Sequence, residues 1–226
     1  MPIYTDSLRA FIQAHLGFLS IESFAALPEL ARFIIAILVM DFIGWFDHRL
    51  KHKVPWFWHL HAVHHSQHEL NLFTDFRFHF FEFLVSKIIM LVPLVALGIS
   101  TPMIVAYVVF TTWFPCFYHA NIKTNLGIFR YIFVTPQSHR VHHSIEDCHR
   151  DKNFGVIFSL WDRLFGTQHE RCNVYPKTGI NDASFPLDRE TILLSLILTP
   201  LRQLIYPVIL ICQIGRNNVA DAGNES

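Results

Sequence analysis

Three long apolar runs separated by short polar stretches organise the first half of the chain. They cover residues 30–46, 76–98 and 102–118, and the first carries only Arg32 and Asp41 as charged side chains. At about 1.5 Å of rise per residue, a helix over 76–98 would extend roughly 34 Å, which is enough to cross the apolar part of a bilayer. The pattern therefore predicts three membrane helices, of which the last two form a helical hairpin.

The remaining segments are less regular. Residues 1–29 mix apolar and polar positions, which predicts an amphipathic or membrane-associated N-terminal segment. The chain becomes polar and loop-rich over 150–190. Residues 191–214 are apolar again but are interrupted by prolines, and this favours an interfacial or core-docked helix over a clean span. We therefore expect one domain over 30–205, followed by a C-terminal tail, 206–226.

The composition also indicates a membrane protein. Hydrophobic residues make up 52% of the chain and charged residues 16%, whereas soluble domains typically carry about 25% charged residues. The formal net charge is zero with histidine neutral, so the basic character of nucleic-acid-binding proteins is missing and no nucleic-acid partner is expected. The four cysteines lie far apart and form no C-x-x-C pair, which indicates reduced thiols.

Nine of the fifteen histidines fall into four short groups that flank the apolar runs. Spacings of three and four residues place side chains on one helix face, so each group could present its imidazoles to a common centre. Imidazole binds zinc, copper, iron and nickel, and one zinc takes about four ligands, so nine imidazoles suit two metals. The four groups are His48 and His52; His61, His64 and His65; His119; and His139, His142 and His143.

The hairpin explains how groups spread over 96 residues could share one site, because it returns the chain to the side that it left. The loops beside the histidines carry several cations, whereas the hairpin turn carries none. By the positive-inside rule, the histidines are expected on the cytoplasmic side of the membrane. These cations are Arg49, Lys51, Lys53, Lys123, Arg130 and Arg140.

Several other polar residues are candidates to support the metal ligands rather than to bind metal. A carboxylate that accepts a hydrogen bond from a ligand histidine fixes its tautomer and raises its basicity, and Glu82 is the candidate for this role. Asp41, inside the first apolar run, would orient a histidine of another group, line a substrate pocket or form an ion pair. His68 and His79 are further candidates for support. Aromatic residues nearby would wall the pocket or pack against other helices; they include Phe57, Phe73, Phe76, Phe80 and Phe81.

Other classes of metalloprotein predict features that this sequence lacks. A zinc hydrolase predicts H-E-x-x-H, but His68-Glu69 is followed by Leu72 where the second histidine should be. A metal transporter predicts histidines near the middle of the spans, and a soluble ferritin-like bundle predicts two E-x-x-H motifs. No nucleophile motif such as G-x-S-x-G is present, so no catalytic side chain is expected beyond the metal centre. The alternative to a redox enzyme at this site is a membrane metal-binding protein or a zinc hydrolase without oxidase activity.

The motifs resemble those of the fatty acid hydroxylase / sterol desaturase superfamily of integral membrane non-haem di-iron enzymes. The resemblance covers roughly residues 30–205, most of the chain, and its motifs recur in family order. The matching segments are 41–49 (DFIGWFDHR), 60–66 (LHAVHHS), 77–82, 119–121 (HAN), 134–144 (VTPQSHRVHHS), 153–155 (NFG) and 159–167 (SLWDRLFGT).

This resemblance implies an all-α fold in which transmembrane helices are capped by a cytoplasmic helical domain that holds two iron ions. It implies O2-dependent hydroxylation or desaturation of a lipid, with electrons from a separate redox protein. The lipid would be a fatty acyl chain, a sterol, an ether lipid or a carotenoid. Some members have a further histidine where this chain has Lys123, so Asn121 or water would complete the second metal's shell. The implied ligands are the nine histidines, with His119 as the ninth.

Overall fold

The computed structural model describes residues 26–96, 99–171 and 173–181, together with 202–206, 208–209 and positions 7, 10, 14 and 185. These residues form helices and loops without a β-strand, so the predicted all-α class is confirmed for them. The helices are α3 (Glu29–Lys53), α4 (Pro55–His65), α5 (Phe80–Ala96), α6 (Thr101–His119), α7 (Pro136–His142) and α8 (Leu160–Leu164), with 3₁₀ turns η2 (Thr74–Phe76), η3 (Gly127–Tyr131) and η4 (Asp147–His149).

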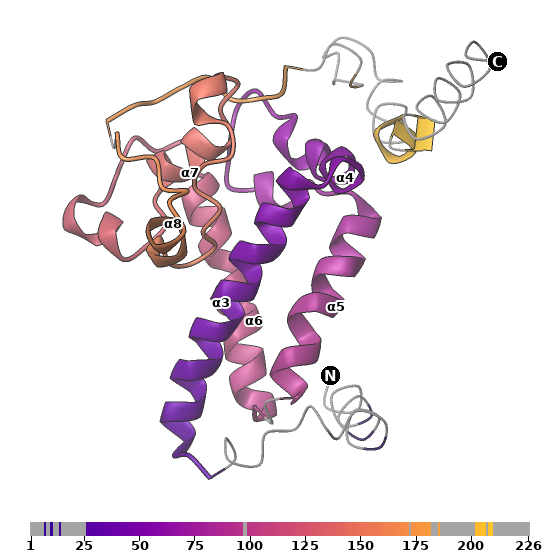
Figure 1. The fold of residues 1–226 in the computed structure, drawn as a ribbon, viewed down its shortest axis with the longest axis vertical. Helices are drawn as coiled ribbons and strands as arrows, with labels where there is room; N and C mark the ends of the chain where they lie inside the picture. The colour runs from indigo at the N-terminus through magenta and orange to yellow at the C-terminus, as the bar shows by residue number, and fades with distance from the viewer. Residues whose placement is uncertain are drawn as a thin grey trace, which may run out of the picture.

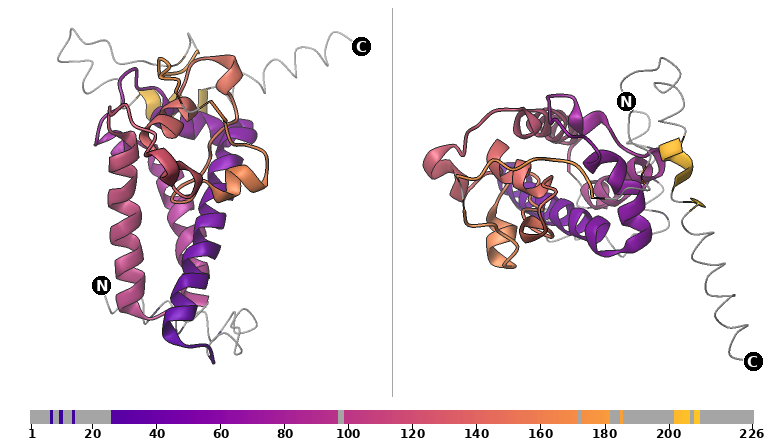
Figure 2. Two further views of the ribbon diagram at one scale, coloured as in Figure 1. Left: turned by 90° about the vertical axis from the view of Figure 1, so that its left-hand side faces the viewer. Right: turned by 90° about the horizontal axis from the view of Figure 1, so that it is seen from above.

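The long helices α3, α5 and α6 run side by side, and the short helices gather over one end of them (Figure 1). We call α4, α7, α8 and the loops between residues 120 and 159 the cap. The turned views show the same division into a bundle and a cap (Figure 2). The bundle core contains Met40 of α3 and Tyr107 of α6, with Met90 of α5 and Ile157 of the cap packed against them.

A proline produces the sharp turn between the bundle and the cap. α3 ends at Lys53, Val54 is extended, and Pro55 begins α4. A residue before proline avoids the helical region, while proline itself is tolerated in the first turn of a helix. The chain therefore folds back, and the last turns of α3 come to lie against α4.

The second apolar run forms a shorter helix than the sequence predicts. The expected helix over 76–98 begins at Phe80, because Arg77 is extended and its side chain reaches back to α4. The Arg77 guanidinium donates hydrogen bonds to the carbonyl oxygen of Val63 (3.0 Å) and to Oγ of Ser66 (3.0 Å). This contact between distant segments competes with the helix and ties the start of α5 to the cap.

Asp41 does not contact the histidines, which corrects the expectation that it orients one of them or lines the pocket. Its carboxylate accepts hydrogen bonds from the backbone N–H of Ile157 (2.8 Å) and Phe158 (3.2 Å) and from Nε1 of Trp161 (2.9 Å). Asp41 lies about 10 Å of helical rise before His48. Its position therefore suits attachment of the cap to the middle of α3 rather than contact with the histidines.

Asp162 makes a second attachment of the same kind. It is 2% exposed, and it accepts hydrogen bonds from Nε1 of Trp45 (3.0 Å) and from the backbone N–H of Phe154 (2.9 Å) and Gly155 (2.7 Å). A Cβ at Gly155 would lie 2.7 Å from the carbonyl oxygen of Phe158, so only glycine fits this close turn. The two aspartates fix residues 153–158 against the bundle.

Within the described part of the chain, α6 is the helix that is both long and apolar enough to cross a membrane. α5 has 17 residues, and α3 does not meet the same criteria. The three-span arrangement and its hairpin therefore stay predictions. The predicted N-terminal segment 1–29 and tail 206–226 lie almost wholly outside the described residues. Of the predicted helix over 191–214, residues 202–206 and 208–209 are described and helical.

Candidate metal centre

The nine histidines singled out from the sequence lie together in two adjacent groups. Within each group, one ligand nitrogen of every histidine lies within 4.8 Å of the others. Seven of the nine are buried, whereas His48 and His52 are partly buried. The five-histidine group contains His48, His52, His61, His65 and His142, and the four-histidine group contains His64, His119, His139 and His143.

Each H-x2-H-H motif is divided between the two groups, which corrects the expectation that each motif serves one centre. On α4, His61 and His65 belong to the five-histidine group, whereas His64 belongs to the other. At about 3.6 residues per turn, positions i and i+4 lie roughly 40° apart around a helix, whereas i+3 and i+4 lie roughly 100° apart. The histidines at i+3 and i+4 therefore face different centres. In the motif at α7, His139 and His143 face the four-histidine group and His142 the five-histidine group.

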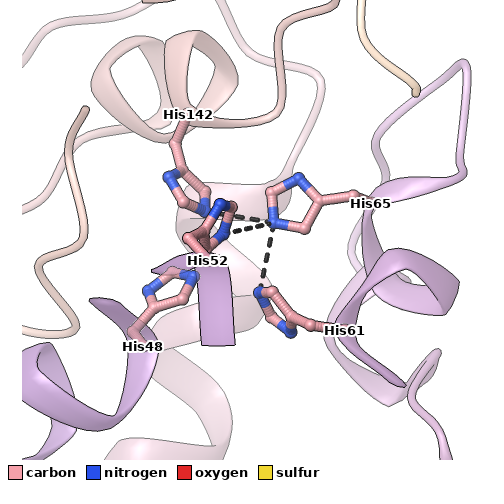
Figure 3. A group of neighbouring side chains, drawn as sticks. All are labelled: His48, His52, His61, His65 and His142. Carbon is pink, nitrogen blue, oxygen red and sulfur yellow. Dashed lines mark hydrogen bonds between the residues drawn. The ribbon is translucent and has the colours of Figure 1, made fainter. Parts of the chain in front are cut away.

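The five-histidine group converges on Nε2 of His65 (Figure 3). This atom lies 3.1 Å from Nε2 of His52, 3.2 Å from Nε2 of His61 and 3.1 Å from Nε2 of His142. Nε2 of His48 is buried and has no hydrogen-bond partner, and its ring lies 4.4 Å from that of His142. Three helices, α3, α4 and α7, supply this group.

The four-histidine group converges on His119, at the end of α6. Its Nε2 lies 3.2 Å from that of His64, 2.8 Å from that of His139 and 3.3 Å from that of His143. Nε2 of His143 and Nε2 of His139 lie 3.1 Å apart. Helices α4, α6 and α7 meet here, so α4 and α7 contribute to both groups.

Hydrogen bonds at Nδ1 set the tautomer of several of these rings. Carbonyl oxygens accept from Nδ1 of His48 (3.0 Å), His64 (3.2 Å), His119 (2.9 Å) and His142 (2.8 Å). A carbonyl oxygen only accepts, so each Nδ1 carries the proton and each Nε2 of the neutral ring presents a lone pair toward the group. The pattern is typical of metal-binding histidines.

Burial keeps these rings neutral. It lowers the pKa of His64 and of His142 to about 4. It also lowers the pKa of His61, His65 and His143 well below the usual value for histidine, and neighbouring histidines add to this effect. A neutral imidazole is the form that binds a metal ion, so the environment favours the binding-competent state near neutral pH.

The residues present fit two metal ions. Nε2 of His64 and Nε2 of His119 each present a lone pair, and the two atoms lie 3.2 Å apart. Two lone pairs at this distance repel each other unless a cation lies between them. An ion with metal–nitrogen bonds of about 2.1 Å would hold neighbouring nitrogens roughly 3.0–3.4 Å apart for bond angles between about 90° and 109°. The observed distances between Nε2 atoms, 2.8–3.3 Å, are close to this range.

A buried ion-pair network supports the five-histidine group from the side of α5. Oε1 of Glu82 lies 2.8 Å from Nδ1 of His61 and 3.2 Å from Nζ of Lys51, and Lys51 is 2.9 Å from Asp47. Glu82 therefore contacts a histidine of this group, and its role as a supporting carboxylate stays a prediction. Lys51 is buried, which corrects the prediction that it is a cation of a loop beside the histidines. Sequence reasoning missed Asp47, although its spacing of four residues from Lys51 was a usable signal.

The other three candidate supporting residues do not contact the ligand rings. Nε2 of His79 donates to the carbonyl oxygen of Leu204 (2.9 Å). His68 is exposed, and its carbonyl oxygen accepts from Thr178. Oδ1 of Asn121 accepts from Arg140 (3.0 Å) and from a tyrosine hydroxyl (2.6 Å), so this oxygen is engaged away from the four-histidine group. Each of them instead contacts a segment that is distant in the sequence. Residue spacing along the chain does not predict such contacts.

A cavity of about 400 Å³ lies between the three bundle helices and ends at the histidines. Its walls include Phe78, Phe83, Met90 and Val108, and five histidines from both groups form its inner end. The aromatic residues expected to wall the pocket do not line this cavity: Phe57 is buried elsewhere, and the other four are exposed or partly exposed at the surface. The histidines of the two groups that line it are His48, His61, His64, His119 and His139.

A second pocket, of about 350 Å³, reaches the five-histidine group and shares no lining residue with the first cavity. His52, His65 and His142 line it together with polar and charged residues of the cap, among them Glu146 and Arg150. Both groups therefore face a cavity toward the bundle whose lining is largely apolar but includes Asp47, Lys51, Asp75, Glu82 and Lys87, whereas the five-histidine group also faces a more polar pocket toward the cap.

Comparisons with known proteins relate this chain to the fatty acid hydroxylase family. The model of the fatty acid hydroxylase family matches residues 33–167, a segment that contains all nine histidines. Ornithine lipid hydroxylase OlsE of Rhizobium tropici is 31% identical over 63% of this chain and 43% of its own length. Human alkylglycerol monooxygenase is 34% identical over 58% of this chain and 29% of its own length. Human cholesterol 25-hydroxylase is 25% identical over 60% and 49%, respectively.

The similarity covers less than half of each of these relatives. No solved structure shows a significant match to the chain. The family match nevertheless covers more than half of the chain and includes both histidine groups together with Asp41, Glu82 and Asp162. The chain belongs to the fatty acid hydroxylase family.

Proposed function

We propose that this protein is a membrane-bound oxidoreductase that hydroxylates or desaturates a lipid at a centre of two iron ions, using O2 and electrons from a separate redox protein. The observation that carries this proposal is the meeting of two all-histidine groups with the inner end of a largely apolar cavity. The relatives are named for oxidation of an ornithine lipid, an alkylglycerol and cholesterol. A lipid substrate for this chain is consistent with both observations.

The nine histidines would hold the two ions, which supply the oxidising power for an unactivated C–H bond that no side chain has. The carbonyl oxygens at Nδ1 and Glu82 orient the rings, so the ligands are placed before a metal binds. The cavity would accept an apolar chain between the bundle helices, exclude water from it and bring one carbon to the histidines. The polar pocket would give small polar reactants a separate route to the five-histidine group.

The same arrangement favours a membrane location. Large apolar side chains are exposed along the outer faces of α3, α5 and α6, among them Ile34, Ile88 and Val109. Such surfaces are unfavourable in water and favourable in lipid. We place the bundle in the bilayer and the histidines at its cytoplasmic face, where the exposed cations beside them, Lys53 and Lys123, are expected.

The proposal is tested by metal content and by product mass. The full chain, purified from membranes and loaded with iron without oxygen, should bind two irons, and His142→Ala should bind fewer. Lipids from cells that express the protein should gain the mass of one oxygen for hydroxylation or lose two hydrogens for desaturation. Well under one iron per chain, together with an unchanged lipid profile, would contradict the proposal and favour a metal-binding protein without oxidase activity.

A further inference from the structure

The cap carries a large exposed apolar surface that the metal centre does not explain. It is formed by the residues around η3 and by α8, two segments about thirty residues apart in the chain. Their large apolar side chains are between 45% and 76% exposed. We call this surface the cap patch; it consists of Ile128, Phe129, Tyr131, Ile132, Leu160, Leu164 and Phe165.

The two segments form one continuous surface because hydrogen bonds join them. The backbone N–H of Ser159 donates to the carbonyl oxygen of Ile132 (2.9 Å), and Oγ of Ser159 donates to that of Arg130 (2.9 Å). The Arg163 side chain also donates to the carbonyl oxygen of Arg130 (3.3 Å). Large contiguous apolar patches are uncommon on soluble monomers and usually mark a site of contact.

The cap patch is continuous with the outer face of the bundle. The ring of Phe165 stacks on Trp45 of α3 at 4.6 Å and lies 5.9 Å from Phe42. Phe42 in turn stacks on Phe46 at 6.4 Å, and Phe46 is exposed on α3. An unbroken series of aromatic rings therefore leads from the bundle surface to α8.

Cations accompany the patch in the way expected at a membrane surface. Arg130 and Arg163 lie 4.5 Å and 4.9 Å, respectively, from the centre of the Tyr131 ring. Aromatic side chains are enriched at membrane interfaces, and arginine can bury its stem in apolar surroundings while its charge reaches lipid headgroups. Apolar side chains combined with arginine suit an anionic lipid surface better than an aqueous one.

We propose that the cap patch inserts into the headgroup region of the bilayer leaflet at which the histidine-bearing end of α3 leaves the membrane, so that the cap is anchored to lipid on one side. This proposal rests on the membrane placement of the bundle in the proposed function. It sets the depth of the metal centre: His48 lies three residues, about 4.5 Å of helical rise, beyond Trp45. A lipid substrate would then reach the cavity with little withdrawal from the leaflet.

Photo-crosslinking in native membranes tests the occupant of the patch directly. The full chain carries p-benzoylphenylalanine in place of Phe129 or Leu164, and its adducts are identified by mass spectrometry after illumination. We expect lipid adducts at both positions. Val109, on the outer face of α6, is the reference position for the bundle in lipid, and Asp147, whose side chain is 83% exposed in the cap, is the reference for water.

The outcomes separate this proposal from the proposed function. The patch proposal alone would be overturned if lipid adducts formed at Val109 but not at Phe129 and Leu164. It would also be overturned if Phe129 and Leu164 cross-linked to a second copy or to another protein. No lipid adduct at Val109 would overturn the membrane placement itself. Lipid adducts at Asp147 as frequent as those at Leu164 would also overturn the patch proposal. As a further check, Ile128→Glu, a change at an exposed position, should reduce the Phe129 lipid adduct severalfold while leaving the melting temperature in detergent unchanged.

Discussion

Oε1 of Glu82 lies 2.8 Å from Nδ1 of His61, so a buried carboxylate contacts one ring of the five-histidine group. In the four-histidine group, Nδ1 of His139 and Nδ1 of His143 are buried without a hydrogen-bond partner. A carboxylate partner raises the basicity of a ligand histidine and fixes its orientation, whereas a ring without a partner at Nδ1 is less constrained. The two groups are therefore unequal, and we expect the five-histidine group to bind its metal more tightly.

The substitution Glu82→Gln should weaken metal binding at the five-histidine group. The amide keeps the shape of the side chain but loses the charge that polarises His61, and loss of such partners typically costs about 10- to 100-fold in affinity. A competition titration with Co²⁺ and a chelator would measure the change in the tighter of two binding phases. Glu170→Gln, at an exposed position, is the matched control. A uniform weakening of both phases would contradict the assignment of Glu82 to one group.

Neighbouring histidines His142 and His143 should have separable roles. His142 belongs to the five-histidine group and His143 to the four-histidine group. Each alanine substitution should therefore reduce the bound metal from about two ions per chain to about one and leave a different ion in place. Co²⁺ spectra of the two variants should differ, and together they should account for the spectrum of the unsubstituted protein. Identical spectra would mean that the motif serves one centre.

The sequence indicates which histidines gather in the structure but not how they divide between the two groups. The nine histidines could be identified because their spacing is local and their chemistry is distinctive. The partition depends on how α4 and α7 face each other, and this follows from tertiary packing. For the same reason the role of Asp41 could not be predicted, since its partners lie 116 to 120 residues away. Lys51 looked like a loop cation because its burial requires α4 and α5 to enclose the end of α3.

The substitution Asp162→Ala should destabilise the protein and loosen the metal centre. It would leave buried donors without acceptors at Nε1 of Trp45, at two backbone N–H groups and at the hydroxyl of Thr167. Each such group costs about 1–3 kcal/mol, so we expect a loss above about 3 kcal/mol. The carbonyl oxygen of Phe154, which orients His48, belongs to the same segment.

Chemical unfolding in detergent micelles measures the stability change, and a chelator titration measures the metal. Asp147→Ala, at an exposed ion pair with Arg150, is the control and should change neither. Unchanged stability for Asp162→Ala would show that residues 153–158 are held by other contacts.

The metal-free protein should lose stability as the pH falls from about 6.5 to about 4. Burial lowers the pKa of His64 and of His142 to about 4 in the folded chain, whereas an unfolded chain titrates near 6.5. Between these values the unfolded state binds more protons, so the free energy of unfolding decreases as the pH is lowered, by roughly 3 kcal/mol per group at most.

Thermal unfolding of the metal-free protein at pH 7 and at pH 5 measures this dependence. His142→Ala should show a smaller decrease between the two values, because one buried titrating group is missing. The same melting temperature at both values for the unsubstituted protein would mean that the two rings are hydrated in the absence of metal.

The cavity between the bundle helices should limit the lipid that the protein accepts, and Thr111→Trp tests this. Thr111 lines the cavity from α6, and its hydroxyl bonds only within its own helix, to the carbonyl oxygens of Tyr107 and Val108. A tryptophan there would occupy space that the chain of the lipid needs, whereas no contact between segments is lost. Oxidation of the longest substrates should fall at least tenfold, while two metal ions remain bound.

Thr112→Trp is the matched control, because Thr112 makes the same kind of bond within the helix, to Val108, but does not line the cavity. If both variants oxidise long and short lipids alike, the lipid reaches the histidines by another route.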